Sequence, residues 1–147
     1  MPDYLSLAAL TALSNYYFTT ARRITRAWYL LIDMHGGAGS AVSAVASDAT
    51  AYAHRNATFK MQFYDRIFPD SATYKPEYFD FLNGWVKAIE DASEGAKFGM
   101  YINYADKNLT KEEAHTHYWK EHYERLVELK ERYDPGRVFE GPQLVGS

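Results

Sequence analysis

Residues 28–35, WYLLIDMH, predict the central strand of this protein. Aromatic and branched side chains dominate the stretch, and Gly36 and Gly37 follow it directly, as at the end of a buried strand. Because successive side chains of a strand point to opposite faces, the stretch divides into two sets. Trp28, Leu30, Ile32 and Met34 share one face, and Tyr29, Leu31, Asp33 and His35 share the other.

Three further stretches are predicted to be strands. Residues 59–65, FKMQFYD, alternate in the same way and bring Gln62 and Tyr64 to one face. Residues 41–45 and 98–104 are shorter candidates that follow or precede glycine and polar turns.

Apolar residues at helical spacing predict helices over residues 3–24, 76–92 and 110–133. The last of these opens with TKEE, a capping box that begins at Thr110. Helices and strands mix without a strand–helix–strand rhythm. The sequence therefore predicts an α+β fold, an antiparallel sheet with helices packed on one face.

Length and composition set further limits. A chain of 147 residues suggests one domain over 1–147, with residues 1–27 as an N-terminal helical segment. The net charge of −3 and the scattered basic residues favour no nucleic-acid partner. No signal peptide or membrane span is evident, so we expect a cytoplasmic protein without a membrane partner. With no cysteine and no pair of the five histidines at metal-ligand spacing, we expect no metal.

The motif YINYAD, residues 101–106, concentrates polar aromatic chemistry at the end of a predicted strand. Tyr101, Asn103 and Tyr104 supply two phenols and an amide, groups that line pockets for flat or polyhydroxylated ligands. Strict alternation sends Tyr101 and Tyr104 to opposite faces. Both reach one pocket only if the chain turns near Asn103.

The motifs HGG, SDATAYAHR, QFY, YINYAD and YDPGRVF occur here in this order. In this combination the chain from Trp28 onward resembles the C-terminal, berberine-bridge-like substrate domain of FAD-linked oxidoreductases, especially fungal oligosaccharide oxidases. Residues 1–27 match only loosely. The family's FAD-binding domain is missing from these 147 residues, so the chain itself is expected to bind no cofactor.

The resemblance assigns roles to several residues. Tyr104 matches the tyrosine that takes the substrate's hydroxyl proton, and Asp33 matches the carboxylate that makes this tyrosine a better base. An ionised carboxylate achieves this by accepting a hydrogen bond and relaying the proton, not by its charge. Gln62 and Tyr29 match a sugar-contacting amide and a sugar-stacking aromatic. The remaining residues of the expected substrate site are Tyr64, Tyr101 and Asn103.

Leu31 departs from the family, because carbohydrate oxidases carry a polar, sugar-contacting residue there. A sugar hydroxyl facing leucine would lose hydrogen bonds to water, at a cost of about 1–3 kcal/mol. The substitution therefore suggests an apolar or aromatic small-molecule substrate. The alternative is that Leu31 is an ordinary core residue.

Three functions remain open. The first is a flavin-independent enzyme, derived from an oxidase substrate domain, that catalyses an isomerisation, cyclisation or pericyclic step on a secondary metabolite. The second is a truncated partner or fragment of an FAD-linked oligosaccharide or alcohol oxidase, and the third is a non-catalytic binding module. A homodimer is also expected, because surface that the flavin domain covers in the family, including the tail 137–145, would otherwise be exposed.

Overall fold

The computed structural model describes residues 4–69, 72–141 and 143–146. The chain forms two compact units, and each is assembled from two separate segments. Unit 1 comprises Met1–His35 and Thr58–Lys97, and unit 2 comprises Gly36–Ala57 and Phe98–Ser147. This division does not test the expected single domain, which stays a prediction.

Unit 1 is built on a two-stranded antiparallel sheet. Strands β1 (Ala27–Met34) and β2 (Phe59–Arg66) confirm the two longer predicted strands. Their register sets the side chains of one face opposite one another in three pairs. These pairs are Tyr29 with Tyr64, Leu31 with Gln62, and Asp33 with Lys60. We call these six residues the tyrosine face.

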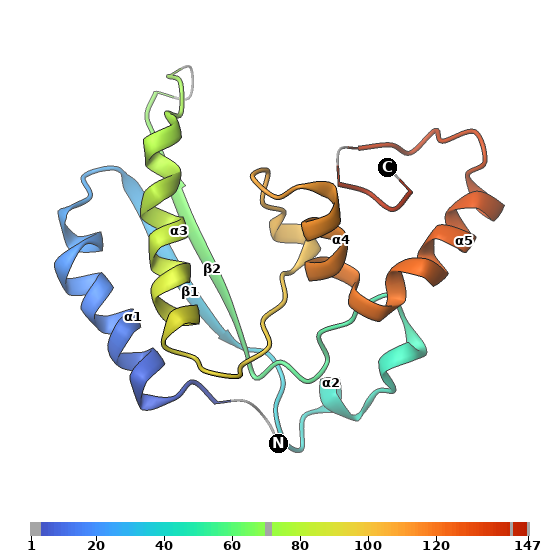
Figure 1. Ribbon diagram of the computed structural model, residues 1–147, viewed down its shortest axis with the longest axis horizontal. Helices are drawn as coiled ribbons and strands as arrows, with labels where there is room; N and C mark the ends of the chain where they lie inside the picture. The colour runs from blue at the N-terminus through green and yellow to red at the C-terminus, as the bar shows by residue number, and fades with distance from the viewer. Residues whose placement is uncertain (1–3, 70–71, 142, 147) are drawn as a thin grey trace. The chain divides into compact units, whose positions relative to one another are not determined.

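Helices α1 (Leu7–Thr19) and α3 (Pro76–Asp91) pack together against the other face of the sheet (Figure 1). The core between them centres on Trp85, which is fully buried. The apolar side chains that pack around it from the strands include Trp28, Leu30, Met61 and Phe63. The predicted α+β class, with helices on one face of an antiparallel sheet, is confirmed.

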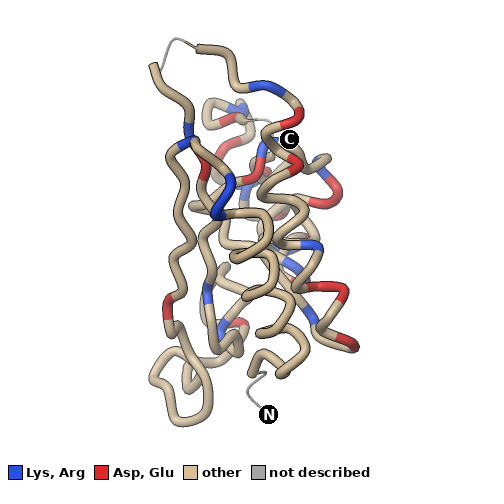
Figure 2. The backbone as a smooth tube through the Cα atoms, turned by 90° about the vertical axis from the view of Figure 1, so that its left-hand side faces the viewer, with Lys and Arg blue, Asp and Glu red and all other residues tan. Residues whose placement is uncertain are grey.

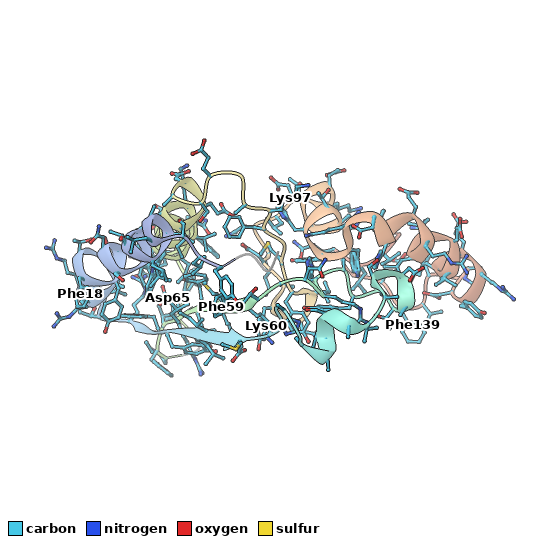
Figure 3. The ribbon with its side chains drawn as sticks, turned by 90° about the horizontal axis from the view of Figure 1, so that it is seen from below. Phe18, Phe59, Lys60, Asp65, Lys97 and Phe139 are labelled. Atoms are coloured by element: carbon cyan, nitrogen blue, oxygen red, sulfur yellow. The ribbon has the colours of Figure 1, made fainter. Side chains whose placement is uncertain are left out.

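A polar cluster closes one end of this core. The Asp65 carboxylate is fully buried and accepts hydrogen bonds from Arg26 Nε at 2.9 Å and Nη2 at 2.6 Å. Tyr74 donates a further bond of 2.9 Å to the same carboxylate. Burial, reinforced by this bond, raises the pKa of Tyr74 to about 12. Figure 3, in which Asp65 is labelled, shows the side chains packed between the strands and the helices of unit 1.

Unit 2 contains α2 (Ala41–Ala44), α4 (Lys111–Trp119) and α5 (Tyr123–Tyr133). Its core consists of Ala114, Tyr118 and Trp119, with partly buried apolar residues around them. The predicted capping box is confirmed: Thr110 Oγ1 accepts from the Glu113 amide, and the Glu113 carboxylate accepts from the Thr110 amide at 2.9 Å.

Two predicted strands are wrong. Residues 41–44 are helical because Ser40 caps them, its Oγ accepting from the Val42 amide at 3.1 Å. Residues 98–101 have no regular structure, and Ile102–Tyr104 form a turn of 3-10 helix. In that stretch the Met100 amide donates to the His117 carbonyl, at 3.0 Å, and not to a neighbouring strand.

Two predicted helices are shorter than expected. The helix predicted over 110–133 is interrupted by the 3-10 turn Lys120–His122, because Lys120 has a φ of 49°. The helix predicted over 3–24 ends at Thr19 and continues only as a 3-10 turn, Ala21–Arg23. Residue 3, the start of that prediction, lies outside the described residues.

The surface carries charges of both signs, interspersed along the backbone in Figure 2. Large apolar side chains are also exposed, among them Met34 on β1 and Val138 and Phe139 near the end of the chain. Among the described helices, none is long and apolar enough to cross a membrane.

Replacing Asp65 should destabilise unit 1 strongly. Asp65→Asn leaves the partly buried Arg26 guanidinium without its counter-ion, which typically costs about 3 kcal/mol. The matched control is Asp91→Asn, which breaks an ion pair of 2.8 Å whose side chains are 73% and 62% exposed. Urea denaturation should show a large loss for the first variant and almost none for the second. Equal losses would contradict the role given to Asp65.

Candidate substrate-binding site

The tyrosine face presents a stacked pair of rings. The rings of Tyr29 and Tyr64 lie 4.7 Å apart and 13° from parallel, on neighbouring strands. Both residues are partly exposed, at 44% and 37%. Because the rings are stacked, each covers one face of the other, and their exposed remainder forms an aromatic patch of the kind on which planar ligands and sugar rings pack.

Next along the strands, Leu31 lies directly opposite Gln62. Leu31 is 44% exposed, so it is not an ordinary core residue of unit 1. Gln62 is half-buried and carries an amide that both donates and accepts hydrogen bonds. The pair therefore combines one apolar and one polar group beside the stacked tyrosines.

The third pair is ionic. Lys60 Nζ lies 3.6 Å from Asp33 Oδ2, and the two side chains are 24% and 41% exposed. Close by, the pKa of His35 is lowered by burial and by the positive charge of Lys60, with Asp33 acting in the opposite direction. The lowered pKa of His35 favours its neutral form, and Asp33 and Lys60 form the ion pair at this end of the face.

In unit 2, YINYAD forms the turn that the sequence required. The Tyr104 amide donates to the Tyr101 carbonyl at 2.8 Å, which brings the two rings edge to face with their centres 5.2 Å apart. Asn103 Nδ2 donates to the Tyr101 hydroxyl at 2.7 Å. The turn near Asn103 is thus confirmed: it bonds the Asn103 amide to the Tyr101 hydroxyl and packs the Tyr104 ring against that of Tyr101.

Tyr52 and His54 support this cluster from the motif SDATAYAHR. The ring of Tyr52 meets Tyr101 edge to face at 6.2 Å and His54 at 5.6 Å. His54 Nε2 lies 3.0 Å from the Tyr118 carbonyl and so donates to it. Burial, and then the charge of Lys120, lowers the pKa of His54. Burial also raises the pKa of Tyr52.

The candidate residues thus fall into two groups. Tyr29, Leu31, Asp33, Gln62 and Tyr64 share one face of unit 1, whereas Tyr101, Asn103 and Tyr104 share one turn of unit 2. Asp33 belongs to unit 1 and Tyr104 to unit 2, and their pairing stays a prediction.

Sequence reasoning missed two members of these groups. Lys60 alternates with Gln62 and Tyr64, so its face was predictable, but its position opposite Asp33 depends on the register. Tyr52 lies in a motif that had been noted without a role. Among the described residues, no group of three or more His, Asp or Glu side chains could hold a metal ion.

Two features of this chain can be compared with known proteins. One is an aromatic, partly polar sheet face that is backed by helices, and the other is a tyrosine-rich turn. A family model described as "Berberine and berberine like" matches residues 100–146. The glucooligosaccharide oxidase of Sarocladium strictum is 42% identical over 139 residues, which make up 92% of this chain and 28% of that protein.

Solved structures agree. The xylooligosaccharide oxidase from Myceliophthora thermophila C1, in complex with xylobiose, has a TM-score of 0.84 at 38% identity and covers 96% of this chain. The carbohydrate oxidase from Microdochium nivale, in complex with a substrate analogue, has a TM-score of 0.85 at 37% identity and covers 97%. This chain is therefore related to the C-terminal, substrate-binding domain of the fungal FAD-linked oligosaccharide oxidases. It spans about 30% of each of these two proteins.

The residues of this chain do not fit a flavin dinucleotide. The sheet is a two-stranded antiparallel ribbon, and the glycine-rich stretch 36–39 after β1 leads only to the four-residue α2, so the described residues contain no parallel strand–helix–strand unit of the dinucleotide-binding kind. A structure of the glucooligosaccharide oxidase carries a 6-S-cysteinyl, 8α-N1-histidyl FAD, whereas this chain has no cysteine.

Acidification should weaken unit 2 through His54. Since the folded-state pKa of His54 lies below its ordinary value of 6.5, its contribution to stability is complete above 6.5 and is lost as the pH falls through the folded-state value. NMR titration of the imidazole should show protonation of His54 below pH 6.5. Wild-type protein should lose more stability than His54→Asn between pH 7.5 and 5. A titration midpoint for His54 at or above pH 6.5 would contradict this expectation.

Proposed function

We propose that this chain is the substrate-binding part of an FAD-linked oxidase, and that it binds a hydroxyl-bearing, carbohydrate-like small molecule. The observation that carries the proposal is the tyrosine face. An exposed aromatic stack, an amide and a carboxylate follow one another along one side of the ribbon. The flavin would be held by polypeptide outside this chain.

The chemistry of the face suits a sugar-like ring. The stacked pair Tyr29 and Tyr64 offers its exposed aromatic surface to the C–H groups of the ring, while Gln62 can bond two neighbouring hydroxyls through its amide. Leu31 removes one polar contact that the resemblance leads us to expect. A substrate with one apolar position, such as a deoxy or aryl-substituted sugar, fits this arrangement better than a fully hydroxylated one.

Tyr104 is the proposed proton acceptor. A phenol accepts a proton at neutral pH only when a neighbouring group takes its own proton or stabilises the product. The resemblance assigns that task to Asp33. The polar cluster around Tyr104, with Asn103 bonded to Tyr101, supports a further role in orienting the substrate's hydroxyl groups.

This proposal replaces the flavin-independent enzyme that sequence reasoning put first. Several relatives that match nearly the whole of this chain are named as oligosaccharide or carbohydrate oxidases, and the chain spans less than a third of each of these. Those matches favour a part of an oxidase over an independent isomerase or cyclase.

A chimera tests the proposal. In the chimera, this chain replaces the matching 28% of the glucooligosaccharide oxidase, and the remaining 72% of that oxidase is kept. We expect a yellow protein that reduces oxygen or a dye when given a sugar alcohol or an oligosaccharide. A chimera that binds flavin and oxidises no hydroxyl compound across a broad panel would overturn the proposal. Turnover by this chain alone, without flavin, would do the same.

In that chimera, Tyr104→Phe should lower turnover by about 10²–10⁴-fold, as expected for the loss of a proton acceptor. The flavin spectrum and melting temperature should stay the same. The matched control is Tyr133→Phe, which removes the hydroxyl of a tyrosine that is 72% exposed on α5. If both variants keep full activity, Tyr104 does not accept the proton.

Leu31→Gln should improve binding of a fully hydroxylated oligosaccharide. Restoring a hydrogen-bond partner for one desolvated hydroxyl should lower KM by about tenfold. For a substrate with an apolar group at that position, KM should rise. Leu7→Gln, at a leucine that is 81% exposed on α1, is the control and should alter neither value. A Leu31 variant that behaves like this control would remove the residue from the substrate site.

A further inference from the structure

The interruption between α4 and α5 has a local consequence. Lys120 has φ 49° and ψ −128°, a backbone conformation that costs a non-glycine residue free energy and persists only where the surroundings enforce it. Because α4 ends at Trp119, the carbonyls of its last turn have no helical partners. Two of them bind the tyrosine-rich region: His117 accepts from the Met100 amide and Tyr118 accepts from His54 Nε2, each at 3.0 Å.

The side chain of Tyr118 holds the other end of the same segment. It is 2% exposed, and its hydroxyl accepts a bond of 3.0 Å from the amide of Asp106. The same hydroxyl donates to Gln143 Oε1 at 3.1 Å. Helix α4 therefore forms hydrogen bonds to the chain on both sides of Tyr104, at Met100 before it and at Asp106, two residues after it.

Gln143 completes the arrangement from the C-terminal tail. Its Nε2 donates to the carbonyls of Asp106 at 2.7 Å and of Leu109 at 3.0 Å. Both backbone polar groups of Asp106 are thus bound by side chains, Tyr118 on the amide and Gln143 on the carbonyl. The Asp106 carbonyl also accepts from the Leu109 amide at 3.3 Å, so these side-chain bonds act together with a few local backbone bonds in a segment that no long helix or strand ladder orients.

We propose that Tyr118 and Gln143 are positioning residues that fix the turn carrying Tyr104. Their bonds set where the segment 100–106 enters and leaves the turn, and therefore the direction of the two tyrosine rings. The catalytic consequence rests on the proposed function, whereas the effect on the turn does not.

A simpler role, anchoring of the tail alone, is already served by other bonds. The Tyr123 hydroxyl accepts from the Gly146 amide at 3.4 Å, and Arg137 Nη1 donates to the Gly146 carbonyl at 2.8 Å. Tyr123→Phe therefore makes a matched control: it removes a tyrosine hydroxyl that bonds the same tail but does not touch the turn.

Amide hydrogen exchange on this chain tests the proposal directly. In Tyr118→Phe and in Gln143→Met, the amide of Tyr104 should exchange about five- to tenfold faster, the effect of weakening a hydrogen bond of ordinary strength. Amides in the middle of α5 should keep their rates. Gln143 lies near the end of the chain, so its variant tests the proposal even if Tyr118→Phe does not fold. Unchanged exchange at Tyr104, or the same acceleration in Tyr123→Phe, would overturn it.

Activity in the chimera described above provides the second readout. Both variants should lower kcat at least tenfold, leave KM within about twofold and shift the pH profile of kcat, since the proton acceptor would be misplaced and not removed. A chimera without activity in its unsubstituted form counts against the proposed function, and the exchange result then stands alone. An active chimera in which both variants keep the original kcat and pH profile would overturn the positioning role.

Discussion

The indole of Trp85 contacts every regular element of unit 1. Its ring lies within 6 Å of Tyr16 on α1, Trp28 on β1 and Phe63 on β2, and its Nε1 donates to the Leu13 carbonyl at 3.2 Å. A two-stranded sheet has little stability alone and must be covered on one side. Because the core around Trp85 covers one face of the sheet, the alternation along each strand places the remaining strand side chains on the opposite face. The tyrosine face is therefore a consequence of the core and not a separate construction.

This dependence explains which parts of the fold could be predicted. Residues 28–35 form an aromatic and branched run that ends at glycines, and residues 59–65 alternate, so both strands follow from the sequence and the two-residue period of a strand then gives their faces. The stretch 41–45 is as apolar as a strand, yet residues 41–44 are helical, with Ser40 as a local cap and Ser43 Oγ bonded at 2.9 Å to the carbonyl of the more distant Arg55. In 98–104, Gly99 lies so close to His54 that a Cβ would come within 2.4 Å of its ring. Such contacts depend on residues distant in sequence, and no periodicity encodes them.

The candidate site divides in the same way. Membership of the tyrosine face was predictable, because it needs only the period of the strand. The partner of Asp33 was not, since a register shifted by two residues would keep the face and replace Lys60 with another residue. The contacts of Tyr118 and Gln143 were even harder to predict from the sequence. These contacts join segments 12 to 37 residues apart, and the break at Lys120 was equally hidden, since the sequence KEHYERL continues a helical pattern through that point.

The two units therefore hold functional side chains by different physical means. On β1 and β2 the backbone ladder orients Tyr29, Leu31 and Gln62, so a side chain can change without loss of the scaffold. In unit 2 the turn is closed by a backbone bond, from the Tyr104 amide to the Tyr101 carbonyl, and side-chain hydrogen bonds fix the segment after it. Buried polar networks of this kind are stable only when every member is satisfied. Evolution of a new substrate preference is consequently easier on the tyrosine face, where Leu31 already differs from the residue that the resemblance predicts, than in the turn that carries Tyr104.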